Sequence, residues 1–309
     1  MISVVLPTYN RAGTLARAVD SVLAQTHLDW ELVIVDDGST DDTQTLLAGY
    51  DDARLRVVRH DRNKGVTAAK NTGFDAMRGD WFTILDSDDE MVPEALEALA
   101  ATAAQTGASA ITCNCLDSQT GEFAGHGWDG DGWREAAELA QVSGEHWGLT
   151  KTSLLGDTRF DERFPGYEGV LWTKVTRRAG RRYYLHKALR VYHTEGKDRV
   201  STSAAGHSFV DMLRADLALS EDHEYLECLA ASNPQQLARL RRQTLKARIV
   251  LGSRLLNRPP LCDLRQRDVY LLAMAAGGAC VVVLAGAAQA LRCRRPGRMR
   301  GRRGSTGGE

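Results

Sequence analysis

Residues 81–89 read WFTILDSDD, in which a run of apolar residues is followed at once by acidic ones. Similar short apolar runs come before it, at residues 4–6, 32–35 and 55–58. Segments with helical patterning separate or follow these runs, at residues 12–25, 41–48, 66–77 and 93–105. Short strands that alternate with helices are typical of right-handed βαβ units and a parallel sheet. The sequence therefore predicts an α/β fold with a doubly wound, mostly parallel sheet.

Polar and acidic residues follow three of the four apolar runs. They are Pro7-Thr8-Tyr9-Asn10, Asp36-Asp37-Gly38-Ser39 and Asp86-Ser87-Asp88-Asp89. Sheets of this kind bind ligands beyond the carboxyl ends of their strands, so we expect these residues to share one site. Carboxylates gathered there repel one another unless a cation binds between them. Because Mg²⁺ and Mn²⁺ take oxygen ligands and can bridge a diphosphate, a metal-dependent phosphate site is predicted.

Both acidic motifs also have a purely structural interpretation. Residues 86–89 can serve as a helix N-cap and first turn, because Ser and Asp are good caps and Pro93 can open a helix. Residues 37–40 form either a turn and cap or a site whose carboxylate accepts hydrogen bonds from a nucleobase or ribose. The position of residues 86–89 directly after an apolar strand favours the metal site.

The composition of the 309 residues excludes several classes of protein. The net charge is −1, so no basic surplus points to nucleic acid as a partner. The six cysteines show neither a C-x-x-C pair nor neighbouring histidine ligands, which predicts free thiols in a reducing cytosol. No G-x-G-x-x-G follows the first strand and no G-x-x-x-x-G-K-[ST] occurs, which excludes a nicotinamide dehydrogenase and a P-loop NTPase.

The pattern changes in the second part of the chain. From Cys113 to Gly148, Trp residues stand among Gly and Asp, which predicts long loops over the rim of the sheet rather than new core. A helix is expected from Glu168 to Ala179, followed by strand-like runs at residues 183–185 and 189–192. A helical region is expected over residues 209–256, ended by two prolines.

Six segments match motifs of a known family in order and spacing. They are residues 4–11 (VVLPTYNR), 21–26 (SVLAQT), 35–41 (VDDGSTD), 63–65 (NKG), 69–73 (AKNTG) and 85–89 (LDSDD). These segments resemble the family 2 glycosyltransferases with the GT-A fold. The resemblance is specific over residues 1–110 and continues more weakly to Ser203. It implies transfer of a sugar from a nucleoside diphosphate donor, with a UDP-sugar expected, aided by Mg²⁺ or Mn²⁺.

The resemblance assigns residues to the nucleotide end of the donor. Pro7, Thr8 and Tyr9 would lie beside the nucleobase, with the Tyr9 ring stacked on it. Asp37 would accept a hydrogen bond from the base, and Asp36 would belong to the same donor site. Seen alone, Tyr9 is more simply interpreted as an ordinary aromatic residue in a turn.

Other residues are assigned to the phosphates and the metal. Lys70 stands where the family usually has Arg, and it would offer positive charge to the nucleotide but not two parallel hydrogen bonds. Alternatively, Lys70 is a solvated charge on a helix. Asp86 would approach the ribose and the metal, with Ser87 beside it in the donor site. Asp88 would bind the metal directly.

An inverting transferase needs a carboxylate base that takes the proton of the acceptor hydroxyl. The family usually supplies it from a Glu-Asp pair at the start of a helix, and the matching stretch here is Glu168-Gly169. Glu168 is therefore either the catalytic base or a charge at a helix N-terminus. Asp161 and Glu162 are other carboxylates in the neighbourhood.

Residues 192–201 resemble the segment with which family members close over the diphosphate. His193 would complete the metal shell, and Arg199 would pair with a phosphate oxygen. A lone His or Arg in a polar loop is also commonly structural or solvated.

Residues 269–291 form an uncharged stretch of 23 residues, long enough to cross a bilayer. Arginines flank it on both sides, and a single span would place the basic tail outside, against the positive-inside tendency. The stretch is therefore expected to lie in the inner leaflet as a helix or a glycine-broken hairpin, with arginines on anionic lipids. The alternative is a buried, Ala-rich helix of a soluble domain.

The residues and the resemblance together predict an inverting glycosyltransferase that acts on a saccharide or lipid-linked acceptor in surface polysaccharide or glycolipid assembly. The enzyme is expected in the cytoplasm, attached to the membrane face without crossing it. A non-catalytic nucleotide-sugar-binding or scaffold protein, which has lost its base at Gly169, is the alternative. Four parts are expected: a donor half (1–110), an acceptor and catalytic half (111–208), a helical extension (209–260) and a membrane-associated tail (261–309).

Overall fold

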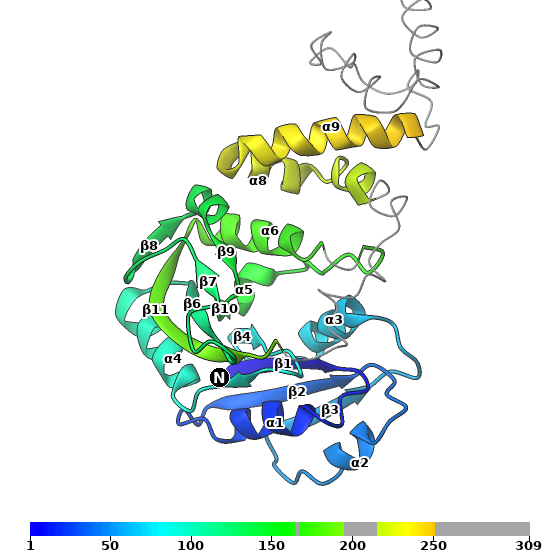
Figure 1. The fold of residues 1–309 in the computed structure, drawn as a ribbon, viewed down its shortest axis with the longest axis vertical. Helices are drawn as coiled ribbons and strands as arrows, with labels where there is room; N and C mark the ends of the chain where they lie inside the picture. The colour runs from blue at the N-terminus through cyan, green and yellow to red at the C-terminus, as the bar shows by residue number, and fades with distance from the viewer. Residues whose placement is uncertain (165–166, 195–214, 251–309) are drawn as a thin grey trace, which may run out of the picture. The chain divides into compact units, whose positions relative to one another are not determined.

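The computed structural model describes residues 1–164, 167–194 and 215–250. Contacts divide the chain into two compact units, Met1–Ala247 and Arg248–Glu309, and the description below concerns the first unit. Its centre is a nine-stranded sheet in the order β3-β2-β1-β4-β10-β6-β11-β5, with β8 paired to β11 (Figure 1).

The first part of the sheet is parallel and has the predicted alternation of strands and helices. Its elements are β1 (Ile2–Thr8), α1 (Leu15–Leu23), β2 (Trp30–Asp36), α2 (Thr43–Leu47), β3 (Leu55–Arg59), α3 (Val66–Ala76) and β4 (Trp81–Ile84). Strand β1 lies between β2 and β4, in register from Ile2 with Trp30 to Thr8 with Asp36. All three strands therefore end at the same edge, and the predicted α/β fold is confirmed.

The second part of the sheet is mixed. Its main elements are β5 (Glu90–Met91), α4 (Ala95–Thr106), β6 (Ala110–Asp117), β10 (His146–Lys151), α5 (Thr152–Leu155), α6 (Gly169–Ala179) and β11 (Arg181–Tyr192). Strand β10 is antiparallel to both β4 and β6, whereas β11 runs parallel to β6. The sheet thus crosses the expected boundary at residue 110, and the division into four parts stays a prediction.

The prediction that residues 113–148 form loops over the rim is wrong. They contribute β6, β7 (Gly125–His126), β8 (Gly132–Glu135), a 3-10 helix (Ala136–Gln141), β9 (Ser143–Gly144) and β10. Cys113 and Trp147 are buried in the main core. The two strand-like runs after α6 are likewise one strand, β11, with register shifts between Leu185, Ala188 and Arg190.

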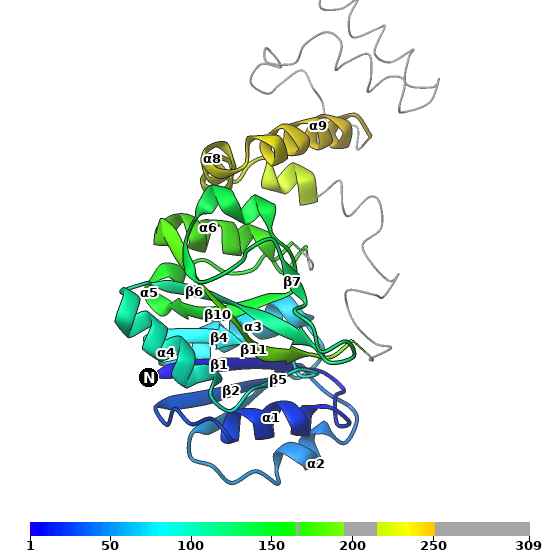
Figure 2. The same ribbon diagram turned by 60° about the vertical axis from the view of Figure 1, so that its left-hand side comes forward.

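Helices cover both faces of the sheet, and alternate strand residues supply the two cores. Val4 and Leu6 of β1 pack into the core beneath α1 and α4, whereas Val5 between them packs with residues of α3, α5 and α6. Successive side chains of a strand point to opposite faces, so a strand buried on both sides is apolar throughout. Figures 1 and 2 show α1 and α3 on opposite sides of β1.

A helical region follows the sheet, as predicted for the part of it that is described. Helix α8 (His223–Ser232) begins after Asp222, whose carboxylate accepts a hydrogen bond from Tyr225 N, and α9 covers Pro234–Val250. Ion pairs join α8 to α6, including Arg178 with Glu224 at 2.9 Å. Across the described residues, we find no helix that combines the length and apolarity needed to span a membrane. Arg199 and the predicted inner-leaflet segment 269–291 lie outside the described residues.

Candidate functional site

The loops that follow β1 and β2 are joined by hydrogen bonds at the carboxyl edge of the sheet. Asp37 N donates to Thr8 O at 2.9 Å, and Thr40 N donates to Asn10 Oδ1 at 2.8 Å. Pro7 and Thr8 are buried in β1, whereas Tyr9 is 39% exposed. The exposed ring leaves room for the stacking on a nucleobase that the resemblance implies, and that role stays a prediction.

Asp36 and Asp37 are buried and held by protein donors. Asp36 accepts a hydrogen bond from Ser39 N at 2.9 Å and pairs with Arg59 at 3.3 Å. The carboxylate of Asp37 accepts from Lys64 N and Gly65 N at 2.8 and 2.7 Å and lies 2.6 Å from His60 Nδ1. A carboxylate offers about four acceptor positions, so Asp37 retains roughly one for a nucleobase.

Replacing Asp37 with Ala should lower the free energy of unfolding by about 3 kcal/mol, because two backbone amides and the buried His60 lose a charged acceptor. Urea denaturation would measure the loss as a lower midpoint at an unchanged slope. Asp61→Ala is the matched control, since Asp61 is exposed in the loop between β3 and α3 that carries Lys64 and Gly65. Equal midpoints for the two variants would contradict this account of Asp37.

The motif at residues 86–89 does not cap a helix. Helix α4 begins at Ala95, and its N-cap is Glu94, which makes no side-chain cap hydrogen bond. Asp89 N donates to Asp86 O at 3.1 Å, so the motif forms a turn directly after β4, and Ser87 is buried within it. The half-buried carboxylate of Asp88 contacts no hydrogen-bond donor or basic group among the described residues, although its backbone oxygen accepts from Arg17.

Arg190 of β11 lies beside the turn that carries the carboxylates of Asp86, Asp88 and Asp89, which are called the acidic rim below. Arg190 was not identified as a site residue from the sequence. Its guanidinium lies 3.6 Å from Asp86, 3.5 Å from Asp89 and 3.0 Å from Glu145, and the residue is 4% exposed. Burial raises the pKa of Asp89 to about 7, although Arg190 acts to lower it. One guanidinium is therefore shared among three carboxylates. The sequence signal was a single Arg inside the apolar run of residues 189–192.

Lys70 brings the candidate base and the acidic rim together. Its Nζ donates to Glu168 Oε1 at 2.8 Å and lies 3.8 Å from Asp86 Oδ1. Burial acts to lower the pKa of Lys70, but the carboxylates of Asp86 and Glu168 outweigh it and the net shift is upward. Lys70 is 7% exposed and so is not a solvated helix charge. Glu168 is the N-cap residue of α6, yet its side chain makes no cap hydrogen bond.

A cavity of about 270 Å³ opens between these groups. It is lined by residues of β4, β6, β10, β11, α3 and α6, among them Lys70, Asp86, Glu145, Glu168, Trp172, Arg182 and Arg190. The other two carboxylates near Glu168 are engaged elsewhere: Asp161 pairs with Arg163 at 2.6 Å, and Glu162 accepts from Asn71 at 3.0 Å. Neither lines this cavity.

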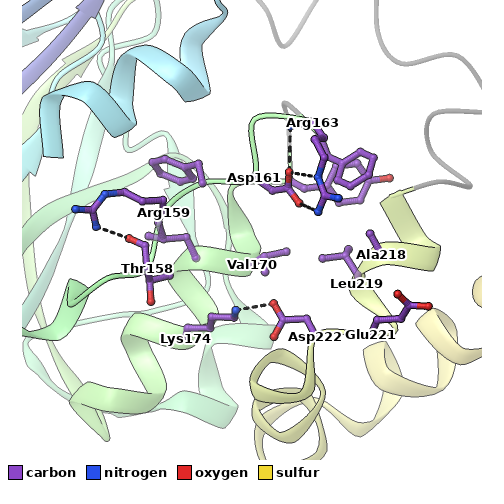
Figure 3. Close-up of a pocket in the computed structure, with 14 residues that line it drawn as sticks. Thr158, Arg159, Asp161, Arg163, Val170, Lys174, Ala218, Leu219, Glu221 and Asp222 are labelled. Atoms are coloured by element: carbon purple, nitrogen blue, oxygen red, sulfur yellow. Dashed lines mark hydrogen bonds and ion pairs between the residues drawn. The ribbon is translucent and has the colours of Figure 1, made fainter. Parts of the chain in front are cut away.

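A second cavity, of about 520 Å³, lies between residues 158–164, α6 and residues 218–222 (Figure 3). Its charged side chains pair with one another or with neighbouring groups, as Figure 3 shows for Asp161 with Arg163 and for Lys174 with Asp222. Because it holds neither Lys70 nor Glu168 nor the acidic rim, it is not the candidate active site.

The residues present can contribute ligands to a cation but do not enclose one. Asp86 and Asp88 follow β4 with carboxylates at the rim, and a hard cation takes one or two such ligands plus phosphate and water oxygens. Nowhere in residues 1–164, 167–194 and 215–250 do three or more His, Cys, Asp or Glu side chains form a cluster that could hold a metal by themselves. His193 Nε2 lies 3.0 Å from Glu90, and its backbone N donates to Asp89 at 3.0 Å, so its metal role stays a prediction.

Comparisons with known proteins agree with this arrangement. A family model described as Glycosyl transferase family 2 matches residues 3–138. The GalNAc(5)-diNAcBac-PP-undecaprenol beta-1,3-glucosyltransferase of Campylobacter jejuni is 32% identical over 248 residues, which cover 74% of this chain and 79% of that protein. The UDP-Glc:alpha-D-GlcNAc-diphosphoundecaprenol beta-1,3-glucosyltransferase WfgD of Escherichia coli is 34% identical over 97 residues, or 31% of this chain and 38% of that one.

A solved structure shares the fold. The crystal structure of S. aureus TarS 1-349 in complex with UDP-GlcNAc superposes with a TM-score of 0.64 at 19% identity, covering 81% of this chain and 72% of that one. Together with the match to the Campylobacter enzyme over most of both chains, this establishes the family. The chain is a glycosyltransferase of family 2 with the GT-A fold.

Proposed function

We propose that this enzyme transfers a hexose, with inversion, from a uridine diphosphate sugar to a hydroxyl group of a lipid-linked saccharide. The observation that carries the proposal is the position of Lys70, which contacts both Glu168 and Asp86 in one cavity. The candidate base and the candidate phosphate end of the donor site thus lie on either side of a single ammonium group.

The acidic rim would hold the diphosphate through a divalent cation. Asp88 would be a direct ligand, with Asp86 beside it, and Lys70 and Arg190 would place positive charge near the same end of the cavity. The ion, when bound, would neutralise charge that develops on the departing diphosphate. Tyr9 would stack on the uracil, and Asp37 would accept from it with its remaining acceptor position.

Glu168 would serve as the general base. Its carboxylate would take the proton of the acceptor hydroxyl while that oxygen bonds to the anomeric carbon and the bond from that carbon to the diphosphate oxygen breaks. Attack from the face opposite the diphosphate inverts the anomeric configuration. Lys70 holds the carboxylate at 2.8 Å and so fixes its direction before the acceptor binds.

The names of two relatives support the proposed acceptor class. Both are named for action on undecaprenol-linked diphosphate saccharides, and one is named for UDP-Glc as donor. A lipid-linked acceptor places the reaction at a membrane surface, which agrees with the sequence-based expectation for residues 269–291 and the flanking arginines.

The test is transfer from a panel of labelled nucleotide sugars, with Mn²⁺, to short diphosphate-linked saccharides, followed by assignment of the new glycosidic bond by NMR. An α-linked donor should give a β-linked product. Donor binding without any product would instead support the non-catalytic alternative, which the glycine at position 169 favours.

The variant Gly169→Asp separates these two functions. A Cβ at position 169 would meet no atom within 4 Å, so the family's usual Glu-Asp pair fits without strain. Asp in the first turn of α6 should raise the unfolding free energy by about 0.5–1 kcal/mol, because it replaces a flexible residue and suits the helix dipole. If Glu168 is the base, kcat should stay within about threefold of the wild type, a change of less than 1 kcal/mol in the barrier. If the wild type has no transferase activity and the Gly169→Asp variant has it, the non-catalytic alternative holds for the wild type.

A further inference from the structure

The cavity has a second end, away from the acidic rim. Glu168, Trp172 and Thr176 are spaced four residues apart around α6, so they share one face of the helix. At 1.5 Å of rise per residue, Thr176 lies about 12 Å beyond Glu168. Arg182, which lines the cavity, donates from Nη1 to Thr176 Oγ1 at 3.3 Å. Its guanidinium therefore marks the end of the cavity that is remote from the candidate base.

Arg182 differs from the other basic residues of the cavity because it has no acidic partner among the described residues. Lys70 pairs with Glu168 and Asp86, and Arg190 is surrounded by carboxylates. Among the described residues, the Arg182 side chain donates a hydrogen bond only to Thr176, and its Nε is buried with no acceptor. Burial lowers the pKa of Arg182 to about 10, which leaves it protonated at neutral pH. The side chain as a whole is partly buried, and a partly desolvated cation without an acidic partner costs free energy that an anionic ligand would offset.

Two polar residues that line the same cavity as Arg182 have unused hydrogen-bonding atoms. Thr112 of β6 and His146 of β10 line the same cavity, and Thr112 Oγ1 and His146 Nε2 are buried with no partner in the described structure. Each lies next in sequence to a core residue, Cys113 or Trp147, and so faces the opposite side of the sheet, toward α6. Burial lowers the pKa of His146, which favours the neutral ring, and Nε2 of a neutral ring can donate or accept one hydrogen bond.

We propose that Arg182, with Thr112 and His146, forms a subsite for an oxyanion, a phosphate or a carboxylate, carried by the acceptor. The inference rests on the proposed function, because it takes Glu168 as the place where the acceptor hydroxyl reacts. The donor diphosphate belongs at the Asp86 end, so an anion bound at Arg182 belongs to the acceptor. The planar guanidinium suits either anion, since it can donate two parallel hydrogen bonds to a phosphate or to a carboxylate.

The size of the cavity supports a compact anionic group. Its volume of about 270 Å³ is just below the roughly 300 Å³ at which pockets for drug-sized ligands begin. Trp172 of α6 also lines the cavity and offers an apolar surface between Glu168 and the Arg182 end. A saccharide unit would therefore lie beside Trp172, with its hydroxyl toward Glu168 and its anion toward Arg182.

Calorimetry on the full-length chain tests the subsite without turnover. Inorganic phosphate, glucuronate and the neutral methyl glucoside would be titrated in the presence of saturating uridine diphosphate and Mn²⁺, which fill the donor end. We expect the preferred anion to bind the Arg182→Gln variant about tenfold more weakly, as for loss of a charged hydrogen bond, and Arg182→Lys at an intermediate level. Binding of the neutral glucoside should not change. Arg181→Gln is the matched control, because Arg181 is exposed and stacks on Trp133 on the other face of β11.

The titrations distinguish a phosphorylated acceptor from an acidic saccharide, and the melting temperature distinguishes a ligand-binding arginine from a structural one. Preference for phosphate indicates a phosphorylated acceptor, and preference for glucuronate an acidic saccharide. If Arg182 is kept for ligand binding, Arg182→Gln should melt no lower than the wild type, since the substitution removes a partly buried cation that has no acidic partner among the described residues. A lower melting temperature, or anion affinity equal in Arg182→Gln and wild type, would overturn the subsite. Failure of the wild type to bind uridine diphosphate would instead count against the proposed function, whereas the anion titration without nucleotide would still report on Arg182.

Discussion

Replacing Glu168 with Gln should reduce kcat roughly 100- to 10,000-fold, the usual contribution of a positioned general base. The amide keeps the size of the side chain and can still accept the hydrogen bond from Lys70, but it cannot take a proton from the acceptor. Donor binding should therefore persist. Product formation from a radiolabelled donor gives the rate, and calorimetry gives the donor affinity.

Glu162→Gln is the control for this loss. Glu162 accepts a hydrogen bond from Asn71 at 3.0 Å, which a glutamine oxygen can also accept, and it does not line the catalytic cavity. Its variant should keep the wild-type rate. If Glu162→Gln abolished transfer and Glu168→Gln did not, the base would have been assigned to the wrong carboxylate.

Replacing Asp88 with Ala should weaken Mn²⁺-dependent donor binding by about 100-fold, because the cation loses a direct carboxylate ligand worth several kcal/mol. The fold should be unaffected, since the Asp88 carboxylate has no hydrogen-bond or ion-pair partner in the described part of the chain. Calorimetric titration of the donor with Mn²⁺ and with EDTA would isolate the metal-dependent part. A melting curve would confirm that the variant is folded.

Asp51→Ala is the control for the acidic rim, because Asp51 is an exposed carboxylate in the loop between α2 and β3. It should bind donor as the wild type does, with and without metal. An Asp88→Ala variant that retained full Mn²⁺-dependent affinity would remove Asp88 from the metal site and leave Asp86 as the remaining candidate at the end of β4.

The strands that could be predicted from sequence are those buried on both faces. Residues 4–6 and 32–35 are continuous apolar runs because helices cover both sides of β1 and β2. Strands β6 and β10 were missed for the opposite reason. One of their faces lines the cavity and carries Thr112, His146 and Thr150, so the apolar run is interrupted and resembles a loop.

The residues of the candidate site could be predicted only where they belong to a local sequence motif. The acidic residues after β4 were found because they directly follow an apolar strand, and Glu168 because its segment resembles a family motif. Arg190, Glu145 and Arg182 were not, since their importance depends on which strands become neighbours. Arg190 meets Asp86 only because β11 pairs with β5 and β6, an arrangement that local sequence does not encode.

The antiparallel strand β10 joins β4, at whose end we propose the donor site, to β6 through backbone pairing. Because these three strands belong to one continuous sheet in the described part of the chain, we expect no hinge closure between β4 and β6. We therefore expect donor and acceptor to be admitted and retained by movement of loops and side chains beside a fixed sheet. Substrate exchange should accordingly alter amide hydrogen exchange in the loops at the carboxyl edge while β4, β6 and β10 stay protected.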